Sequence, residues 1–299
     1  MKTIISKTLA ALLLAASISA PAASAAATDD IALVAIRRPA PLSAAPGLGA
    51  SRVTVLVSGF KSGVSPEPSA FFGEARDGFS YASVRDLASA LGARTSRETD
   101  GSMRVFAPGL ELTASAGDKY IVANGRYLYA PDGVSLTGDE LYAPVRQIAR
   151  AFGAQALWSD AFKTVLITPG GEPIAPAETA YSAEDVKWMS RIIYAEAGGE
   201  SFEGMLAVGN VVMNRVRSEY HPDTVYGVIF DRRSGVQFTP AYSGAINNTP
   251  SELCVIAAKL ALDGAEIVGG SLYFSAAPNC WAARHRDLYA TIGGHDFYL

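Results

Sequence analysis

A glutamate on the apolar face of a predicted helix is the residue of this chain best suited to chemistry. The helix begins at an S-x-x-D motif formed by Ser182 and Asp185. Its apolar face repeats at helical spacing and leads to Glu196, just before Gly198 and Gly199 end the helix. The apolar residues of that face are Val186, Met189 and Ile193. A carboxyl group on such a face is costly to ionise, so it stays protonated and can donate a proton to a leaving sugar oxygen.

Two alternatives stay open for this part of the chain. Glu196 is also compatible with a structural role, in which it pairs with an arginine such as Arg191 or Arg215. Glu200, one turn further on, is the rival for the proton donor. Because Glu200 follows the two glycines, we expect it to be exposed.

A second helix, predicted over residues 203–217, has almost no polar face, which indicates that it is buried all round. Asn210 and Asn214 lie on this helix at i and i+4. Buried amides need hydrogen-bond partners, and we expect the two asparagines to find them by lining a cleft. A third helix is expected to open at Thr249, with Glu252 as its capping-box partner.

The order of these motifs resembles the SleB-type cell wall hydrolase family, over about 115 residues. The matching segments are A-E-A-x-G-E at 195–200, E-G-x-x-A-V-x-N-V-V-x-N-R-V at 203–216, V-x-G-V-I-F at 225–230, Gln237-Phe238, G-G-x-L-Y-F at 269–274, and Trp281. The chain departs from the family pattern at Gly199, where many relatives have a bulkier or basic residue. The segment 279–285 also looks longer than the usual asparagine-containing loop.

This resemblance implies a mainly helical, lysozyme-like domain that cleaves the β-1,4 bond between N-acetylmuramic acid and N-acetylglucosamine in peptidoglycan. In SleB relatives the reaction is lytic transglycosylation, in which Glu196 would act first as acid and then as base. Aromatic faces stack on pyranose rings, and amides bond to acetamido groups. On this basis the candidate substrate-binding residues are Tyr194, Asn214, Gln237, Phe238, Tyr273 and Trp281.

An internal repeat precedes this region. The pattern Y-x-x-V-R-x-L/I-A, followed by G-A, begins at Tyr81 and again at Tyr142, 61 residues later. Each copy predicts a short helix flanked by strands, and the region resembles the copper amine oxidase N-terminal-like domain, a stalk module of exported bacterial proteins. We see no histidine cluster and assign the module no copper. Arg85 and Arg146 are expected to fasten each repeat through hydrogen bonds, and the module is a candidate for docking to the cell wall.

The N-terminus is typical of an exported protein. Lys2 and Lys7 precede an apolar stretch and an A-x-A cleavage motif at 23–25, which together predict a secretory signal peptide. The chain has 25 basic and 29 acidic residues, so removal of this leader leaves a net charge near −6. This charge argues against a nucleic-acid partner, and no further segment is a membrane-span candidate. The expected location is outside the cell, at the cell wall, with the spore cortex as one candidate.

Composition then divides the chain. We expect a signal peptide at 1–25, a linker at 26–50 with a stray strand at 31–36, the repeat domain at 51–169, a second linker at 170–180 and the catalytic domain at 181–299. The second linker is rich in Pro and Gly, so few contacts are expected to cross it. The sequence therefore predicts an α+β protein, with a repeated strand-helix-strand stalk module followed by a mainly helical catalytic domain.

Other chemistries find weaker support in the sequence. Cys254 and Cys280 are an even pair in an exported chain and are a disulfide candidate. The spacing of His221, His285 and His295 fits no familiar metal pattern, so we predict no metal and no cofactor. Two other functions stay open: a zinc-dependent peptidoglycan amidase, and a protein that binds the wall without catalysis.

Overall fold

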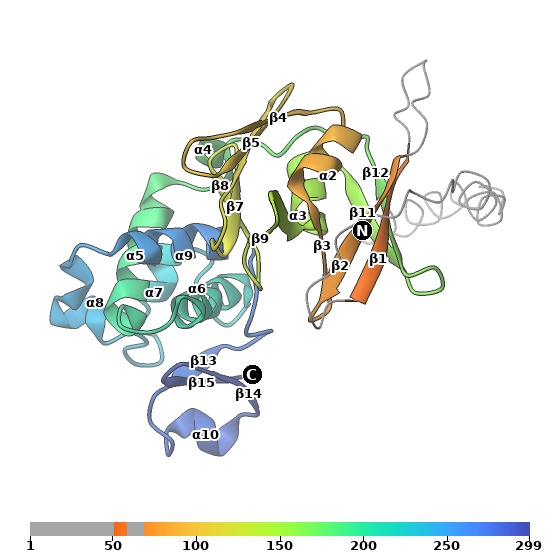
Figure 1. Cartoon of the computed structure of the whole chain (residues 1–299). Coiled ribbons are helices and arrows are strands. Elements are labelled where there is room, and N and C mark those ends of the chain that lie inside the picture. The colour runs from red at the N-terminus through yellow and green to blue at the C-terminus, as the bar shows by residue number, and fades with distance from the viewer. Residues whose placement is uncertain (1–50, 59–68) are drawn as a thin grey trace, which may run out of the picture. The chain divides into compact units, whose positions relative to one another are not determined.

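The structure is a computed structural model that describes residues 51–58 and 69–299. The predicted signal peptide, the first linker and the strand expected at 31–36 lie outside these residues. Strands dominate the N-terminal half of the described chain and helices dominate the C-terminal half (Figure 1). The predicted α+β class is thereby confirmed.

The N-terminal domain contains two β-sheets, in which most strand pairs are antiparallel. The first has the strand order β11-β12-β1-β2-β3-β10-β9 and the second the order β4-β5-β6-β7-β8. The strands are β1 (Ser51–Val57), β2 (Ser69–Arg76), β3 (Phe79–Ser83), β4 (Arg94–Arg97), β5 (Met103–Ala107), β6 (Leu110–Ala114), β7 (Tyr120–Ala123), β8 (Arg126–Tyr129), β9 (Ser135–Thr137), β10 (Glu140–Pro144), β11 (Gln155–Ser159) and β12 (Thr164–Thr168). One parallel pair, β1 with β12, lies within the first sheet.

The two repeat copies are related by an approximate two-fold axis. Each copy is a strand, a short helix and two further strands, and the helices are α2 (Val84–Ala90) and α3 (Val145–Ala151). The strands β3 and β10 pair antiparallel, with Ala143 opposite Ala82. Because these two alanines hold the same place in the two copies, each copy presents the same backbone edge to the other. The repeat inferred from the motif is therefore a structural unit, confirmed by the pairing.

The repeat motif is explained by burial. Its valine, its Leu or Ile and its alanine point from α2 and α3 into one core that also receives side chains from both sheets. These core residues are Val84, Leu87, Ala88, Val145, Ile148 and Ala149. The motif's glycine follows each helix in the left-handed region, at Gly92 and Gly153. A Cβ at Gly153 would stand 2.0 Å from the Glu172 carbonyl oxygen, so no other residue fits there.

Helices and one small sheet build the C-terminal domain. The helices are α4 (Ala177–Ala180), α5 (Ala183–Ala197), α6 (Phe202–Arg217), α7 (Val225–Ile229), α8 (Pro240–Ser243), η1 (Ala245–Asn247), α9 (Glu252–Leu262) and α10 (Trp281–His285). The sheet has the order β13-β15-β14, formed by β13 (Tyr273–Ser275), β14 (Leu288–Ile292) and β15 (His295–Tyr298). Helices α5, α6 and α9 pack on one another and enclose the main core of this domain.

Side-chain caps set the starts of these helices. Ser182 and Asp185 form the predicted capping box of α5, and Ser201 caps α6 through the N–H of Gly204. The start predicted for the third helix at Thr249 is wrong. Ser251 caps α9 instead, because its hydroxyl accepts from the N–H of Cys254.

The segment 170–180 is not a loose linker. Ile174 is buried in the core of the repeat domain, its carbonyl accepts from the Asn124 side chain, and the Ala177 N–H donates to the Asn124 carbonyl. A polar junction also joins the two domains. The Asp263 carboxylate, only 1% exposed, accepts from Arg126 at 2.7 Å and from Arg150 at 3.4 Å. The expectation that few contacts cross this segment is therefore wrong.

The proposed disulfide is also absent, because both cysteines are free thiols with other neighbours. Cys254 is fully buried in α9, and its Sγ lies 3.7 Å from the sulfur of Met205. The Cys280 sulfur accepts from the N–H of Ala283 at 3.3 Å and caps α10. Cys254 therefore belongs to the helical core and Cys280 to a surface turn. The sequence pattern did not distinguish these two environments.

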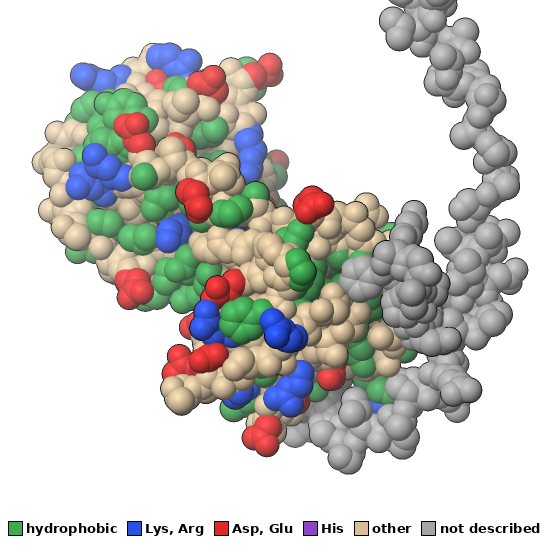
Figure 2. Space-filling view, turned by 90° about the horizontal axis from the view of Figure 1, so that it is seen from above, with side chains coloured by type: hydrophobic (Ala, Val, Ile, Leu, Met, Phe, Trp, Pro, Cys, Tyr) green, Lys and Arg blue, Asp and Glu red, His purple; other side chains and the backbone are tan. Residues whose placement is uncertain are grey.

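Surface charge and helix length give two further results. Figure 2 shows a face on which Lys and Arg side chains are interspersed with Asp and Glu, in keeping with the formal net charge of −4. Over residues 51–58 and 69–299, no helix combines the length and the apolar character needed to cross a bilayer.

We predict that Arg126→Met lowers the free energy of unfolding by about 3 kcal/mol at pH 7, because it leaves a buried carboxylate without its closest cation. Burial already raises the pKa of Asp263, and the nearby Arg126 opposes this rise. Loss of Arg126 raises that pKa further. The destabilisation should therefore grow as the pH rises through the folded pKa and shrink in acid.

Urea denaturation at several pH values measures this effect. Lys163→Met is the matched control, because Lys163 pairs with Asp160, whose side chain is 84% exposed. That variant should lose less than about 1 kcal/mol. Equal losses for the two variants would contradict the importance of the buried junction.

Candidate active site

Glu196 lies in the last turn of α5 and is half-buried. Burial raises the pKa of Glu196, and the positive charge of Arg215 acts in the opposite direction. No ion pair of Glu196 is found among the residues that the structure describes, with either Arg191 or Arg215. The surroundings of Glu196 therefore favour the protonated form of its carboxyl group more than water would.

The end of α5 is shaped by a close approach. Gly198 keeps a right-handed helical conformation, so the need for a glycine does not come from its backbone angles. A Cβ at Gly198 would stand 2.5 Å from the Tyr194 carbonyl oxygen and 2.9 Å from its ring. The Tyr194 ring therefore lies over Gly198, half-buried, one helical turn from that residue. Tyr194 supports the turn that carries Glu196.

Arg215, on α6, is the most unusual charged residue near Glu196. It is only 5% exposed, and its Nε donates to the Leu272 carbonyl at 2.8 Å. Its Nη1 is buried and has no partner among the described residues. Burial lowers the pKa of Arg215 to about 10, against the influence of Tyr273, Asp231 and Glu196. A buried guanidinium nitrogen without an acceptor is costly, and a substrate oxygen would satisfy it.

Aromatic side chains gather next to this arginine. The Arg215 guanidinium lies 6.0 Å from the ring centre of Tyr273, and the Tyr273 and Trp281 rings are 5.6 Å apart. Trp281 is 52% exposed and stacks on His285, while Arg286 lies over both Tyr273 and Trp281. Of the predicted sugar-binding residues, Tyr273 and Trp281 are therefore brought together beside Arg215. An exposed, fixed indole face is well suited to stacking on a pyranose ring.

Glu200 is held by the backbone of another segment. Its carboxylate accepts from the Gly294 N–H at 2.8 Å, in the two-residue turn that joins β14 to β15. It is half-buried rather than exposed as expected. The Gly293 and Gly294 backbones fit against the carboxylate, and a Cβ at Gly293 would stand 2.2 Å from it. This hydrogen bond and close packing indicate a structural role for Glu200.

Three other predicted sugar-binding residues have different surroundings. Asn214 donates to the carbonyls of Gly269 and Ser271, so its amide fastens a loop instead of facing a substrate. Phe238 is 1% exposed and packs beneath Arg215, 5.0 Å from its guanidinium, so it is a core residue. Gln237 is half-buried and donates to the Gly235 carbonyl. Asn210 likewise bonds the backbone of the 265–267 segment, so the expectation that both asparagines line a cleft is wrong.

The three histidines have separate environments. His285 donates from Nδ1 to the Trp281 carbonyl, and His295 packs on the ring of Phe274. Burial lowers the pKa of His221, and the nearby charge of Arg215 acts in the same direction. Within the described part of the chain, no group of three His, Cys, Asp or Glu side chains is arranged to hold a metal ion.

Two protein-family models match the chain. Residues 199–298 match the model described as Cell Wall Hydrolase, and residues 70–167 match the model described as Copper amine oxidase N-terminal domain. The C-terminal domain is therefore similar to the cell wall hydrolase family. Both resemblances drawn from the sequence motifs are confirmed. The matched part of the cell wall hydrolase domain begins just after Glu196, so it does not test the role of that residue.

Proteins similar to the cell wall hydrolase domain include the spore cortex-lytic enzyme of Oceanobacillus iheyensis, which is 38% identical over 105 residues. These residues are 35% of this chain and 37% of that protein. The spore cortex-lytic enzyme of Bacillus subtilis is 31% identical over 122 residues, 39% of this chain and 38% of that protein. The chain thus spans little more than a third of the length of these curated relatives.

A solved structure is similar over the same region. The catalytic domain of the germination-specific lytic transglycosylase SleB from Bacillus anthracis is 35% identical to this chain. The match covers 40% of this chain and 97% of that one, with a TM-score of 0.37.

We predict that Glu196→Gln reduces the rate of glycan cleavage by roughly 10²–10⁴-fold, because glutamine keeps the shape but has no transferable proton. Glu200→Gln is the matched control, since its amide oxygen can still accept from Gly294 and activity should be nearly unchanged. Release of soluble fragments from purified peptidoglycan measures both variants, and thermal unfolding checks that they fold. A dead Glu200→Gln beside an active Glu196→Gln would show that the wrong glutamate has been chosen.

A second prediction concerns the pH profile. A general acid works in its protonated form, so activity should fall as the pH rises through the pKa of Glu196. Arg215 opposes the raised pKa, so Arg215→Gln should raise it further and move the falling limb of kcat/KM to higher pH. Arg215→Lys keeps the charge and should leave the limb near its original position. A limb that does not move, or moves to lower pH, in Arg215→Gln would contradict the electrostatic coupling.

Proposed function

We propose that this protein is an exported, peptidoglycan-cleaving enzyme, a lytic transglycosylase that acts on the β-1,4 bond between N-acetylmuramic acid and N-acetylglucosamine. The observation that carries the proposal is the half-buried carboxyl of Glu196, whose pKa burial raises, beside an arginine with an unpartnered nitrogen. The names of the similar spore cortex-lytic enzymes and of the SleB lytic transglycosylase support the reaction class.

The surrounding acidic side chains support a mechanism with one carboxyl group. Glu200 accepts from the Gly294 N–H, Glu203 pairs with Lys119 at 3.1 Å, and Asp231 pairs with Arg233 at 3.0 Å. A hydrolase of the inverting or retaining type needs a second carboxylate to activate water or to attack the sugar. These three carboxylates already have partners, so Glu196 is left as the group for proton transfer.

In the proposed reaction the Glu196 carboxyl donates its proton to the glycosidic oxygen as the bond from that oxygen to C1 of the muramoyl residue breaks. The resulting carboxylate then takes the proton of the muramoyl C6 hydroxyl. The C6 oxygen bonds to C1, which gives a 1,6-anhydro sugar and returns Glu196 to its protonated form. Because the hydroxyl is already bound beside C1, it has an effective-concentration advantage over water.

The proposed substrate contacts involve Arg215 and the aromatic residues near it. The buried Nη1 of Arg215 has no partner among the described residues, and we propose that it donates to a substrate oxygen, such as an acetamido carbonyl. Trp281, which is 52% exposed and contacts His285 and Arg286, is the candidate platform for a sugar ring. Tyr273 joins these two groups, since it lies near both. The repeat domain would hold or present the enzyme at the wall.

We predict that cleavage of purified peptidoglycan produces mainly anhydro-muramoyl ends. The product is then lighter by one water than a hydrolysis product, and digestion in ¹⁸O-water leaves it without label. Mass spectrometry of the released fragments measures both properties, with Glu196→Gln as the inactive control. Mostly labelled reducing ends would overturn the transglycosylase mechanism and leave Glu196 as the acid of a hydrolase.

A further inference from the structure

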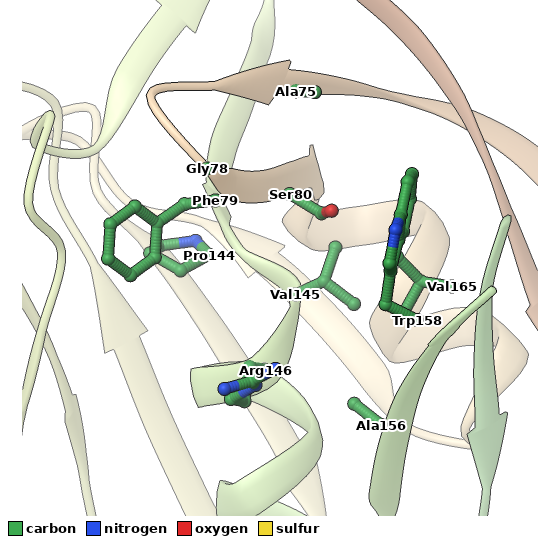
Figure 3. A pocket seen from close by; sticks show the side chains of 10 residues that line it. All are labelled: Ala75, Gly78, Phe79, Ser80, Pro144, Val145, Arg146, Ala156, Trp158 and Val165. Atoms are coloured by element: carbon green, nitrogen blue, oxygen red, sulfur yellow. The ribbon is translucent and has the colours of Figure 1, made fainter. Parts of the chain in front are cut away.

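A cavity of about 280 Å³ lies in the repeat domain, and none of the candidate active-site residues lines it. Figure 3 shows Phe79 and Pro144 on one side, Trp158 and Val165 on the other, and Val145 between them. Ser80 and Arg146 contribute a hydroxyl and a guanidinium group to the cavity lining. Phe79 is 46% exposed and Trp158 is 40% exposed, so both rings have a free face.

Comparison of the two repeat copies shows that, in the described part of the chain, the position beside Arg146 has no carboxylate. Arg85 in the first copy corresponds to Arg146 in the second, and Phe79 corresponds to Glu140, each pair 61 residues apart. Arg85 makes an ion pair with Glu140 at 3.0 Å across the β3–β10 contact. In the symmetric position, Arg146 faces the site of Phe79, which has no carboxylate. No ion pair or hydrogen bond of the Arg146 guanidinium is found among the described residues.

The same comparison corrects the expected role of the two arginines. Arg85 fastens its repeat as predicted, because Glu140 also accepts from Ser83 at the start of α2. Arg146 does not fasten its copy and is exposed at the cavity. Arg85 and Arg146 thus hold equivalent positions in the two copies. Among the described residues, a carboxylate pairs with Arg85 but not with Arg146.

We propose that the cavity binds a carboxylate group of peptidoglycan, with Arg146 as the cation and Trp158 and Phe79 as the ring-contacting walls. The carboxylate would take the place that Glu140 holds beside Arg85 in the other copy. An Arg–carboxylate pair gives both charge and orientation, and an exposed indole accepts the apolar face of a sugar or of a peptide side chain. The proposal rests on the proposed function, since that function supplies peptidoglycan as the partner.

Two parts of peptidoglycan carry this chemistry: the acidic peptide stem, and the lactyl carboxylate of a muramic acid without a stem. The free stem peptide and N-acetylmuramic acid are therefore two separate probes, and an uncharged N-acetylglucosamine oligomer is the third. Binding of each to the full chain carrying Glu196→Gln is measured by calorimetry. We expect one of the two acidic probes to bind and the uncharged oligomer not to compete for the same site.

Two substitutions test the cavity itself. Arg146→Gln should weaken binding of the acidic probe about tenfold, the size expected for a lost charged hydrogen bond. Phe79→Glu restores the symmetric carboxylate, which should pair with Arg146 and remove binding of the acidic probe. Arg97→Gln is the matched control, because it removes an exposed charge from the same domain and stands at the position in the first copy that Trp158 holds in the second.

The outcomes separate this proposal from the proposed function. If Arg146→Gln binds the acidic probe as tightly as Arg97→Gln does, or if Phe79→Glu still binds it fully, the cavity is not the site. Cleavage of soluble glycan strands by Arg146→Gln with an intact Glu196 is measured in parallel. Normal cleavage with lost probe binding supports the cavity, whereas absent cleavage in the unmodified chain would overturn only the proposed function.

Discussion

The candidate active site depends on a glutamate and an arginine, Glu196 and Arg215, that are both poorly solvated and influence each other without forming an ion pair. Burial pushes Glu196 towards its neutral form and lowers the pKa of Arg215, while each group partly offsets the shift of the other. A direct contact would lower the pKa of Glu196 and leave it as a carboxylate with no proton to donate. Complete separation would leave the arginine too costly to bury. The intermediate arrangement raises the pKa of Glu196 and leaves one guanidinium nitrogen of Arg215 without a partner among the described residues.

The packing around this pair explains how such an arrangement is held. The Arg215 guanidinium is fixed by the Leu272 carbonyl and by the ring of Phe238, both of which belong to other segments than α6. The loop that supplies Leu272 is in turn fastened by the two asparagines of α6. Asn214 and Phe238, two residues expected from the sequence to bind sugar, thus help to support a buried cation, Arg215. The polarity of the two asparagines serves the loop backbone, since buried carbonyls and N–H groups need partners.

Local patterns in the sequence were sufficient for features that depend on neighbouring residues. The box at Ser182, the apolar face leading to Glu196 and the repeated helix motif all follow from spacings of three or four residues. Features that depend on distant segments were not predictable in this way. The acceptors of Asn214 lie 55 and 57 residues away, the Asp263 junction joins residues 137 apart, and the partner of Glu200 lies 94 residues away. Arg215 was named only as a partner for Glu196, although its burial on the apolar α6 was a signal for a special role.

The contact between Glu200 and Gly294 has a practical consequence for work with this protein. The β14–β15 hairpin is close to the C-terminus in sequence, yet its turn is bound by a glutamate only four residues after Glu196. Trimming the last strands would therefore leave a half-buried carboxylate without its backbone donor, next to the helix end that carries the acid. An affinity tag fused after Leu299 requires a spacer that does not pull on β15, and strands β14 and β15 are a poor place to shorten the protein for crystallisation.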